Sequence, residues 1–217
     1  MTPPAVRPAS LDDVPAMLSV YAGYIGTPVT FELEPPSEEE FAARMGPDPA
    51  YPWLVYDDGG VAGYAYARRL KDRAAYDWCA ETSVYVDAGR RGEGVGSALY
   101  SELLSLLGAQ GVRSVLACVT VPNPESEGFH RAMGFERVGL FEKAGYKLGA
   151  WRDVAWYRLE LSGGGGEPGP LRPWTRGRRC SCRRPCRTSG PTPPGPRPRR
   201  PRCGTCCRAG SARPCAC

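Results

Sequence analysis

The sequence predicts one α/β domain built on a single mixed sheet, followed by a tail that cannot fold by itself. Segments of alternating apolar residues, typical of strands, are interspersed with segments whose apolar residues recur every three or four positions, typical of helices. A basic, glycine-rich turn, RRGEGVG at residues 90–96, joins one such strand to one such helix. The composition changes abruptly after Leu161, so we expect the domain at residues 1–161 and the tail at residues 162–217.

The first half of the domain reads as a strand, two helices and a hairpin. A short strand is expected at residues 5–8. Ser10 can cap the first helix, and Ser37 can cap the second in a capping box with Glu40. The apolar stripe of the first helix consists of Val14, Met17, Leu18 and Tyr21. Residues 52–70, PWLVYDDGGVAGYAYARRL, give two strands joined at DDGG, which is a hairpin turn signal.

The second half alternates between strands and helices. A strand at residues 80–86 precedes the glycine-rich turn, and a helix at residues 96–110 follows it. The leucines on one face of this helix are Leu99, Leu103, Leu106 and Leu107. The remaining elements are a strand at 112–121, a short helix in 123–135 closed by Gly134, and two alternating strands at 136–146 and 153–161.

Charge and cysteine are distributed unevenly along the chain. Residues 162–217 hold thirteen arginines and one acid, a net charge of +12 in a chain of net charge +5, which leaves −7 for residues 1–161. Eight of the ten cysteines also lie in the tail, so the domain holds only Cys79 and Cys118, as expected in a reducing compartment. Because no run of 18 apolar residues and no secretory signal occurs, we expect a cytoplasmic protein with no membrane partner.

The tail is rich in Pro, Gly and Arg, and its large apolar residues besides cysteine are Leu171 and Trp174. It cannot bury enough surface to offset the entropy of ordering, so we expect disorder. Cys203 and Cys206 form a single C-x-x-C with no matching second pair, so we expect no metal. The arginines could bind nucleic acid non-specifically. The simpler interpretation is that the tail has no function. Its composition resembles the product of GC-rich DNA translated outside its selected frame.

The glycine-rich turn has the features of an anion site. Backbone N–H groups at a helix start favour phosphate, and glycines let the backbone approach it closely. Arg90 or Arg91 can neutralise the remaining charge. The Walker pattern is absent, and glycines at 92, 94 and 96 do not match the dinucleotide fingerprint. A solvated loop that caps a helix is the alternative.

At this point the residues resemble a known family. RRGEGVG fits the R/Q-x-x-G-x-G/A pyrophosphate signature of the GNAT acetyltransferases, with Arg91, Gly94 and Gly96 in the signature positions. Four further segments, YPWLVYDDGGVAGYAYA, AYDWCAETSVYV, PNPESEGFHRAMGF and GYKLGAWRDVAWYRLEL, look like the phosphinothricin and methionine sulfoximine N-acetyltransferases. The resemblance covers about residues 4–161, and the tail has no counterpart in it.

The resemblance implies a mostly antiparallel sheet, with helices on both faces, that splays open at a cleft for acetyl-CoA. The pantetheine arm would pair with one strand, the diphosphate would lie on the glycine-rich turn, and Asn123 would hold the arm near the thioester. Asn123 also fits a helix N-cap before Pro124. The expected cofactor contacts are Val84, Tyr85, Val86, Arg91, Gly92, Glu93, Gly94, Val95, Gly96, Ser97, Asn123 and Ser126.

The implied chemistry is direct attack of an amine on a thioester, which requires a base because an amine is mostly protonated at pH 7. Glu81 matches a proposed base of the family, and a carboxylate in an apolar cleft gains basicity by desolvation. His130, the only histidine, matches a family histidine near the site and suits proton relay, although a lone histidine is more often structural. Cys79 and Cys118 are expected to be buried, inert thiols.

The acceptor implied by the resemblance is a small amino acid analogue. Phe31 matches the segment that lines its pocket, and Lys71, Arg73 and Tyr76 match substrate contacts, although a solvated basic loop is the alternative. The late GYKLGAWRDV loop suggests a homodimer. A protein N-terminus or a polyamine is the alternative acceptor, and binding of nucleic acid by the arginine-rich tail is the alternative outside enzymes.

Overall fold

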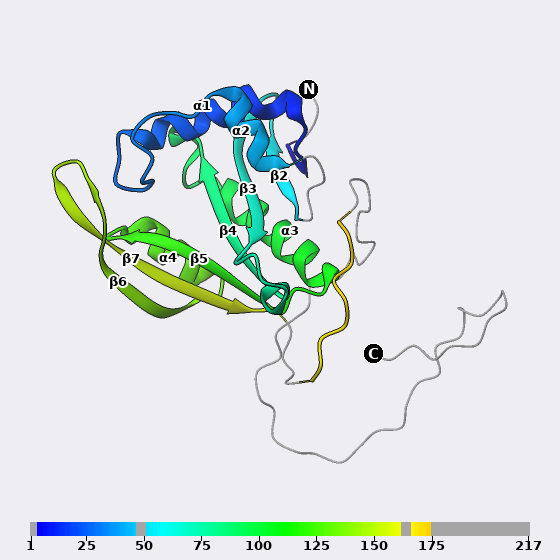
Figure 1. Cartoon of the computed structure of the whole chain (residues 1–217). Helices are drawn as coiled ribbons and strands as arrows, with labels where there is room; N and C mark the ends of the chain where they lie inside the picture. The colour runs from blue at the N-terminus through cyan, green and yellow to red at the C-terminus, as the bar shows by residue number, and fades with distance from the viewer. Residues whose placement is uncertain (1–3, 47–50, 162–165, 175–217) are drawn as a thin grey trace, which may run out of the picture. The chain divides into compact units, whose positions relative to one another are not determined.

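The computed structural model describes residues 4–46, 51–161 and 166–174, and there it confirms the predicted order of elements (Figure 1). The strands are β1 (Ala5–Pro8), β2 (Trp53–Asp57), β3 (Val61–Arg69), β4 (Cys79–Val86), β5 (Ser114–Val121), β6 (Glu136–Lys147) and β7 (Ala150–Glu160). The helices are α1 (Val14–Ile25), α2 (Glu38–Met45), α3 (Val95–Gln110) and α4 (Pro124–Ala132). None of the helices in these ranges has both the length and the apolar character to cross a membrane.

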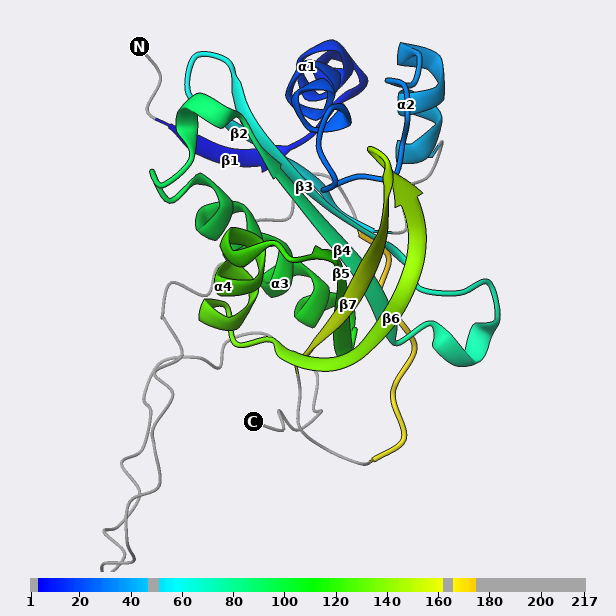
Figure 2. The same cartoon turned by 90° about the vertical axis from the view of Figure 1, so that its left-hand side faces the viewer.

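In the described residues, seven strands form one sheet in the order β1-β2-β3-β4-β5-β7-β6. The neighbouring strands are antiparallel except for β4 and β5, which run parallel. This arrangement confirms the mixed, mostly antiparallel sheet. Helices α1 and α2 lie on one face and α3 and α4 on the other (Figure 2).

Alternation along the strands divides the core into two clusters, because successive side chains point to opposite faces. On β2, Leu54 packs on the α3 side, while Trp53 and Val55 pack on the side of α1 and α2. Leu99, Leu103 and Leu107 of α3 are fully buried, as their helical spacing predicts. Burial of each such side chain stabilises the fold by about 1.5–3 kcal/mol.

The helix starts follow the predicted caps. Ser37 and Glu40 form the capping box: the Glu40 N–H donates to Ser37 Oγ at 3.2 Å, and the Ser37 N–H donates to Glu40 Oε2 at 2.8 Å. Asn123 caps α4, since its Oδ1 accepts from the Ser126 N–H at 3.2 Å. After Ser10 the chain first forms a short 3-10 turn, Leu11–Asp13, and α1 proper begins at Val14.

The parallel strands β4 and β5 separate half-way along their length. Their described pairs are Cys79 with Ser114, Ala80 with Val115 and Glu81 with Leu116. Beyond Glu81 no further pair joins them in the described chain, so the backbone edge of β4 from Thr82 to Val86 faces an opening. This is the splay that the resemblance implied.

Residues 169–172, which the sequence analysis assigned to the tail, contact the domain. Trp78 Nε1 donates to the Gly169 carbonyl at 2.8 Å, and the Arg172 N–H donates to the Gln110 carbonyl at 2.8 Å. Leu171 packs against the α3 side of the core. The single C-x-x-C and most of the arginine-rich tail lie outside the described residues, so the boundary after Leu161 stays a prediction.

Candidate functional site

A cavity of about 650 Å³ lies where β4 and β5 part. Its lining comes from β4, the glycine-rich turn, the start of α3 and the start of α4, together with two residues from α1 and the segment after it. The lining residues are Tyr24, Val29, Val84, Val86, Arg90, Arg91, Gly92, Gly94, Val95, Gly96, Ser97, Asn123, Glu125, Ser126 and Phe129. Most of the residues expected to hold the cofactor therefore meet in one cavity.

The glycine-rich turn opens toward this cavity because its glycines adopt conformations that other residues rarely adopt. Gly92 and Gly94 have φ of +80° and +83°, and Gly94 is the N-cap residue of α3. A Cβ at Gly96 would lie 3.4 Å from the Phe129 ring, so a larger side chain there would fill the space next to the helix start. The N-terminal N–H groups of α3 are thus accessible to an anion.

The two arginines of the turn have different environments. Arg90 pairs with Glu93 at 2.6 Å and with Asp58 at 2.7 Å, and these bonds raise the pKa of Arg90 and fasten the turn to the β2–β3 hairpin. Arg91 lies over the Tyr24 ring at 5.1 Å, and the nearest carboxylate oxygen, from Glu125, is 3.7 Å away. Arg91 is therefore the better placed to neutralise a diphosphate. Glu93, one of the expected contacts, points to Arg90 and does not line the cavity.

A second cavity, of about 470 Å³, lies on the other side of β4. Val84 and Val86 line the first cavity, whereas Glu81, Ser83 and Tyr85 line the second, as the alternation of a strand requires. The remaining lining residues are Tyr21, Val29, Thr30, Phe31, Glu32, Arg44, Trp53, Tyr66, Arg68, Cys118, Thr120 and Val154. Val29 lines both cavities, so the two adjoin at this residue.

Glu81 is buried, with 9% of its surface exposed, and its carboxylate faces Arg68. The two residues are directly opposed on β4 and β3, and Arg68 Nη2 donates to Glu81 Oε1 at 2.6 Å. Burial alone would lower the pKa of Arg68, but the hydrogen bond and charge of Glu81 raise it instead. The expectation of a carboxylate in an apolar cleft was therefore incomplete, because a guanidinium accompanies it.

His130 lies in the core and lines neither cavity, with 5% of its surface exposed. Its Nδ1 donates to the Ser126 carbonyl at 2.8 Å, and its Nε2 lies 3.3 Å from the Tyr100 hydroxyl. That hydroxyl bonds Thr82 Oγ1 at 3.1 Å, and Thr82 bonds the Leu116 carbonyl at 3.3 Å. This chain of bonds ends where β4 and β5 separate. Burial lowers the pKa of His130, and the bond to Ser126 offsets this in part.

Comparison with known proteins agrees with this geometry. Residues 6–156 match the family described as the acetyltransferase (GNAT) domain. The chain belongs to the GNAT acetyltransferase family. It is 41% identical to the phosphinothricin N-acetyltransferase of Streptomyces viridochromogenes over 179 residues, which cover 80% of this chain and 96% of that protein. It is 32% identical to the L-methionine sulfoximine/L-methionine sulfone acetyltransferase of Pseudomonas paraeruginosa, over 72% of this chain and 94% of that protein.

Among solved structures, the GNAT superfamily phosphinothricin acetyltransferase from Sinorhizobium meliloti, crystallised in complex with acetyl-CoA, superposes with a TM-score of 0.73. The two chains are 36% identical, and the match covers 94% of that chain and 77% of this one. The protein is thus an acetyl-CoA-dependent N-acetyltransferase of the GNAT fold, and acetyl-CoA is its co-substrate. The glycine-rich turn, with its open helix start and Arg91, fits a diphosphate.

The residues expected at the acceptor site of this GNAT enzyme are not all brought together. Phe31 lines the second cavity and packs on Gly145, where a Cβ would come within 2.6 Å of its ring. Lys71, Arg73 and Tyr76 lie on the exposed segment between β3 and β4 and do not line either cavity. Within this chain, then, the basic loop and Phe31 remain apart.

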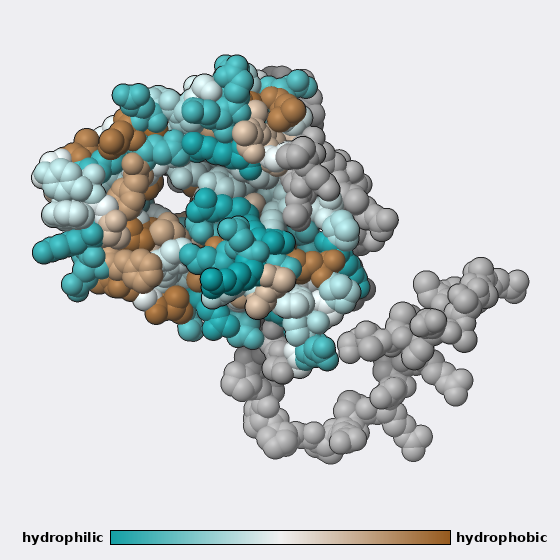
Figure 3. Space-filling view, in the orientation of Figure 1, coloured by the Kyte–Doolittle hydropathy of each residue, from teal (hydrophilic) through white to brown (hydrophobic). Residues whose placement is uncertain are grey.

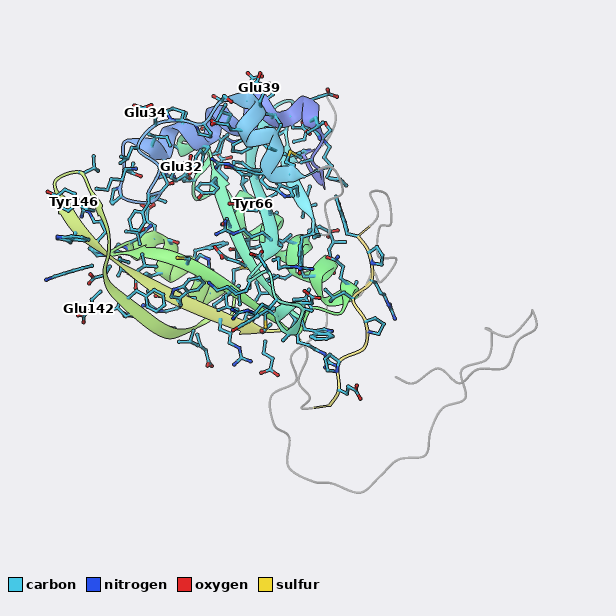
Figure 4. The ribbon with its side chains drawn as sticks, viewed as in Figure 1. Glu32, Glu34, Glu39, Tyr66, Glu142 and Tyr146 are labelled. Carbon is cyan, nitrogen blue, oxygen red and sulfur yellow. The ribbon has the colours of Figure 1, made fainter. Side chains whose placement is uncertain are left out.

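Two residues near Phe31 were missed by sequence reasoning: Arg44, which lines the second cavity, and Lys147, which bonds the segment that carries Phe31. Arg44 pairs with Glu32 at 2.7 Å, and Lys147, which is buried, donates to the carbonyls of Thr30 and Glu32 at 2.7 Å. Lys147 thereby fastens the segment that carries Phe31 to the β6–β7 hairpin. The two Lys147 contacts join parts of the chain more than a hundred residues apart, and no local pattern signals them. Glu32, on the segment after α1, and Tyr66, on β3, are labelled in Figure 4, and both line the second cavity.

The two cysteines of the domain differ from expectation in one case. Cys79 is half-buried, with its Sγ 3.1 Å from Ser114 Oγ. Cys118 is exposed and lines the second cavity, so its expected burial was wrong. The surrounding protein and then the charge of Glu81 nevertheless raise the pKa of the Cys118 thiol to about 11. A thiol that stays protonated at neutral pH is a poor nucleophile, which agrees with direct transfer.

Proposed function

We propose that this enzyme moves the acetyl group of acetyl-CoA to the α-amino group of a small amino acid analogue of the phosphinothricin or methionine sulfoximine type. The names of its relatives support this acceptor class. The observation that carries the proposal is the position of Glu81. Glu81 is the last residue of β4 that pairs with β5, and its side chain lines the second cavity. Three residues further on, Val84 lines the first cavity.

In this proposal Glu81 accepts a proton from the acceptor ammonium. The thioester supplies an activated acetyl carbon, and the amine nitrogen forms the new C–N bond as the C–S bond breaks. The ammonium loses two protons in all: one protonates the leaving thiolate and one passes to solvent. Arg91 and the N–H groups at residues 92–97 hold the diphosphate, while Asn123 and Ser126 line the path of the pantetheine arm.

His130 takes a positioning role in this scheme instead of the catalytic one expected from the sequence. Its burial and lowered pKa favour a neutral ring, and its bonds run to Ser126 and Tyr100, not to Glu81. The ring thus braces α4, which carries Ser126, against the point where β4 and β5 part.

We also propose a homodimer and a cytoplasmic location. The β6–β7 hairpin exposes a set of large apolar side chains, which are Val138, Leu140, Phe141, Tyr146, Leu148 and Trp151. Hydrophobic surface lies between hydrophilic residues on the left side of Figure 3, where this hairpin is found. Large apolar side chains that are exposed together on one hairpin indicate a protein contact. The cytoplasm supplies acetyl-CoA and keeps free thiols reduced.

An acceptor screen tests the function. The full chain is mixed with acetyl-CoA and a thiol reagent, and phosphinothricin, methionine sulfoximine, spermidine and a peptide with a free N-terminus are compared. We expect kcat/KM to be highest for the two amino acid analogues. Because Glu32 and Glu81 are each neutralised by an arginine, the cavity offers a polycation no excess negative charge. Acetylation of spermidine or the peptide alone would contradict the proposal.

A further inference from the structure

Within the described residues, the Arg68 guanidinium uses only one of its hydrogen-bond donors, in its pair with Glu81. One N–H of the guanidinium, on Nη2, bonds Glu81 Oε1. The described residues provide no hydrogen-bond partner for its other N–H groups, and 61% of the Arg68 side chain is exposed. The Glu81 side chain, in contrast, is 12% exposed. A buried carboxylate and a guanidinium with spare donors therefore stand side by side on one wall of the acceptor cavity.

The other guanidinium in this cavity is more firmly held. Arg44 bonds Glu32 at 2.7 Å and lies over the rings of Phe41 and Tyr21, at 5.7 Å and 6.0 Å from their centroids. Arg68 lines the cavity together with Tyr66, and among the described residues its ion partner is Glu81 alone. Of the two arginines, Arg68 is the one that can turn toward a ligand without breaking other contacts.

The charges of this pair complement those of a free α-amino acid, which bears an ammonium and a carboxylate on one carbon. We propose that Arg68 is a specificity-determining residue: it binds the α-carboxylate of the acceptor while Glu81 receives the neighbouring ammonium. The inference rests on the proposed function and deepens it. Polyamines and protein N-termini carry no carboxylate next to the amine, so Arg68 selects against both.

Arg68 also prepares Glu81 for its role. In the free protein the Arg68 guanidinium orients the buried Glu81 carboxylate through its hydrogen bond to Oε1. When the acceptor carboxylate takes over part of the guanidinium, Glu81 exchanges that partner for the acceptor ammonium, so the buried Glu81 carboxylate is not left unpaired. The amino acid substrate thereby places its amine next to Glu81, at the junction of the two cavities.

The experiment compares matched acceptors on matched variants. L-phosphinothricin and its α-carboxamide are assayed with the wild type, R68A, R68K and R69A. Arg69 is the neighbouring arginine, pairs with Asp77 and lies outside the cavity, so R69A removes the same charge without the contact. For R68A we expect kcat/KM for the acid to fall about 10- to 100-fold and the acid-over-amide preference to fall at least tenfold. R68K should retain part of this preference, and R69A all of it.

Calorimetric binding of L-phosphinothricin in the presence of coenzyme A separates this inference from the proposed function. If the wild type binds the acid through Arg68 but acetylates neither acceptor, the proposed function fails and the inference stands. If R68A keeps the acid-over-amide preference, the inference is overturned, even where overall activity falls because Glu81 has lost its partner. If the wild type neither binds nor acetylates the acid, both are overturned.

Discussion

The hydroxyl of Tyr24 on α1 bonds both backbone groups of Val86 on β4. It donates to the Val86 carbonyl at 2.6 Å and accepts from the Val86 N–H at 3.1 Å. These are backbone groups that we expected to pair with the pantetheine arm. The same tyrosine ring lies under Arg91, so one side chain touches two parts of the cofactor cavity. In the free protein Tyr24 therefore provides the hydrogen-bond partner of the backbone of β4 where the sheet has opened.

Replacement of Tyr24 by Phe tests this relationship. Loss of the hydroxyl leaves the Val86 N–H and carbonyl without their protein partner, so the free energy of unfolding should fall by about 1 kcal/mol. The acetyl-CoA dissociation constant should not rise, because the arm then meets no competitor at Val86. Denaturant titration and calorimetry measure the two quantities. The control is Tyr56→Phe, because the Tyr56 hydroxyl makes no hydrogen bond in the described residues. A tenfold weaker cofactor affinity in Tyr24→Phe would contradict this expectation and show that the Tyr24 hydroxyl binds acetyl-CoA.

Acetyl-CoA should stabilise the protein through the glycine-rich turn. At 100 times its dissociation constant, a ligand adds about 2.7 kcal/mol to the free energy of unfolding. Gly96→Leu should abolish this shift, since its side chain would meet Phe129 and block the helix start. Gly108→Ala on the same helix has open space around it and should keep the full shift. A thermal shift with acetyl-CoA that persists in Gly96→Leu would exclude the turn as the diphosphate site.

Glu81→Gln keeps the size of the side chain but cannot accept a proton. Loss of a general base typically lowers the rate on the order of 10²–10⁴-fold. Acetyl-CoA affinity should change little, because Glu81 does not line the cofactor cavity. The defect in kcat should shrink at high pH, where the acceptor amine is already deprotonated. If Glu81 only binds the ammonium, KM should rise while kcat stays near the wild-type value at every pH.

His130 is the only histidine of the chain, so its protonation can be isolated in the pH dependence of stability. Its folded pKa is lowered by burial, so as the pH falls below about 6.5 the unfolded chain takes up a proton that the folded chain does not. Stability should therefore decrease from pH 7.5 to pH 5.5, and His130→Gln should remove that part of the decrease. For a positioning role we expect His130→Gln to lower the free energy of unfolding by about 1–3 kcal/mol and kcat by less than tenfold. A larger loss of kcat with unchanged stability would restore the catalytic role.

Truncation separates the domain from its tail. A chain that ends at Trp174 keeps the contacts of Gly169, Leu171 and Arg172 and should unfold at the same denaturant concentration as the full chain. A chain that ends at Leu161 loses them and should be less stable by about 1–2 kcal/mol. Both should retain acetyl transfer, because none of these residues lines either of the two cavities described above. Loss of transfer in the chain ending at Trp174 would show a role for the arginine-rich segment.

The sequence by itself determined the order of elements and the cofactor end of the site. Capping boxes, leucine spacing and the DDGG turn act between residues a few positions apart, so they can be recognised without the fold. The glycine-rich turn is likewise a local feature: Gly94 is the N-cap residue of α3 and Val95 begins the helix, within the same seven residues. For this reason the sequence could point to most of the residues that line the first cavity, which we expect to hold the cofactor.

Only the tertiary structure decided which residues meet in and around the second cavity, where we propose that the acceptor binds. The pairing of Arg68 with Glu81 depends on the register of β3 and β4, which are joined by a segment without a tight turn signal. Tyr24 meets Val86 across 62 positions, and Lys147 holds Thr30 across 117. The burial of His130 likewise depends on which strands and helices close around it. Contacts of this kind form when distant segments pack together, and the local patterns of a single sequence do not encode which of them will meet.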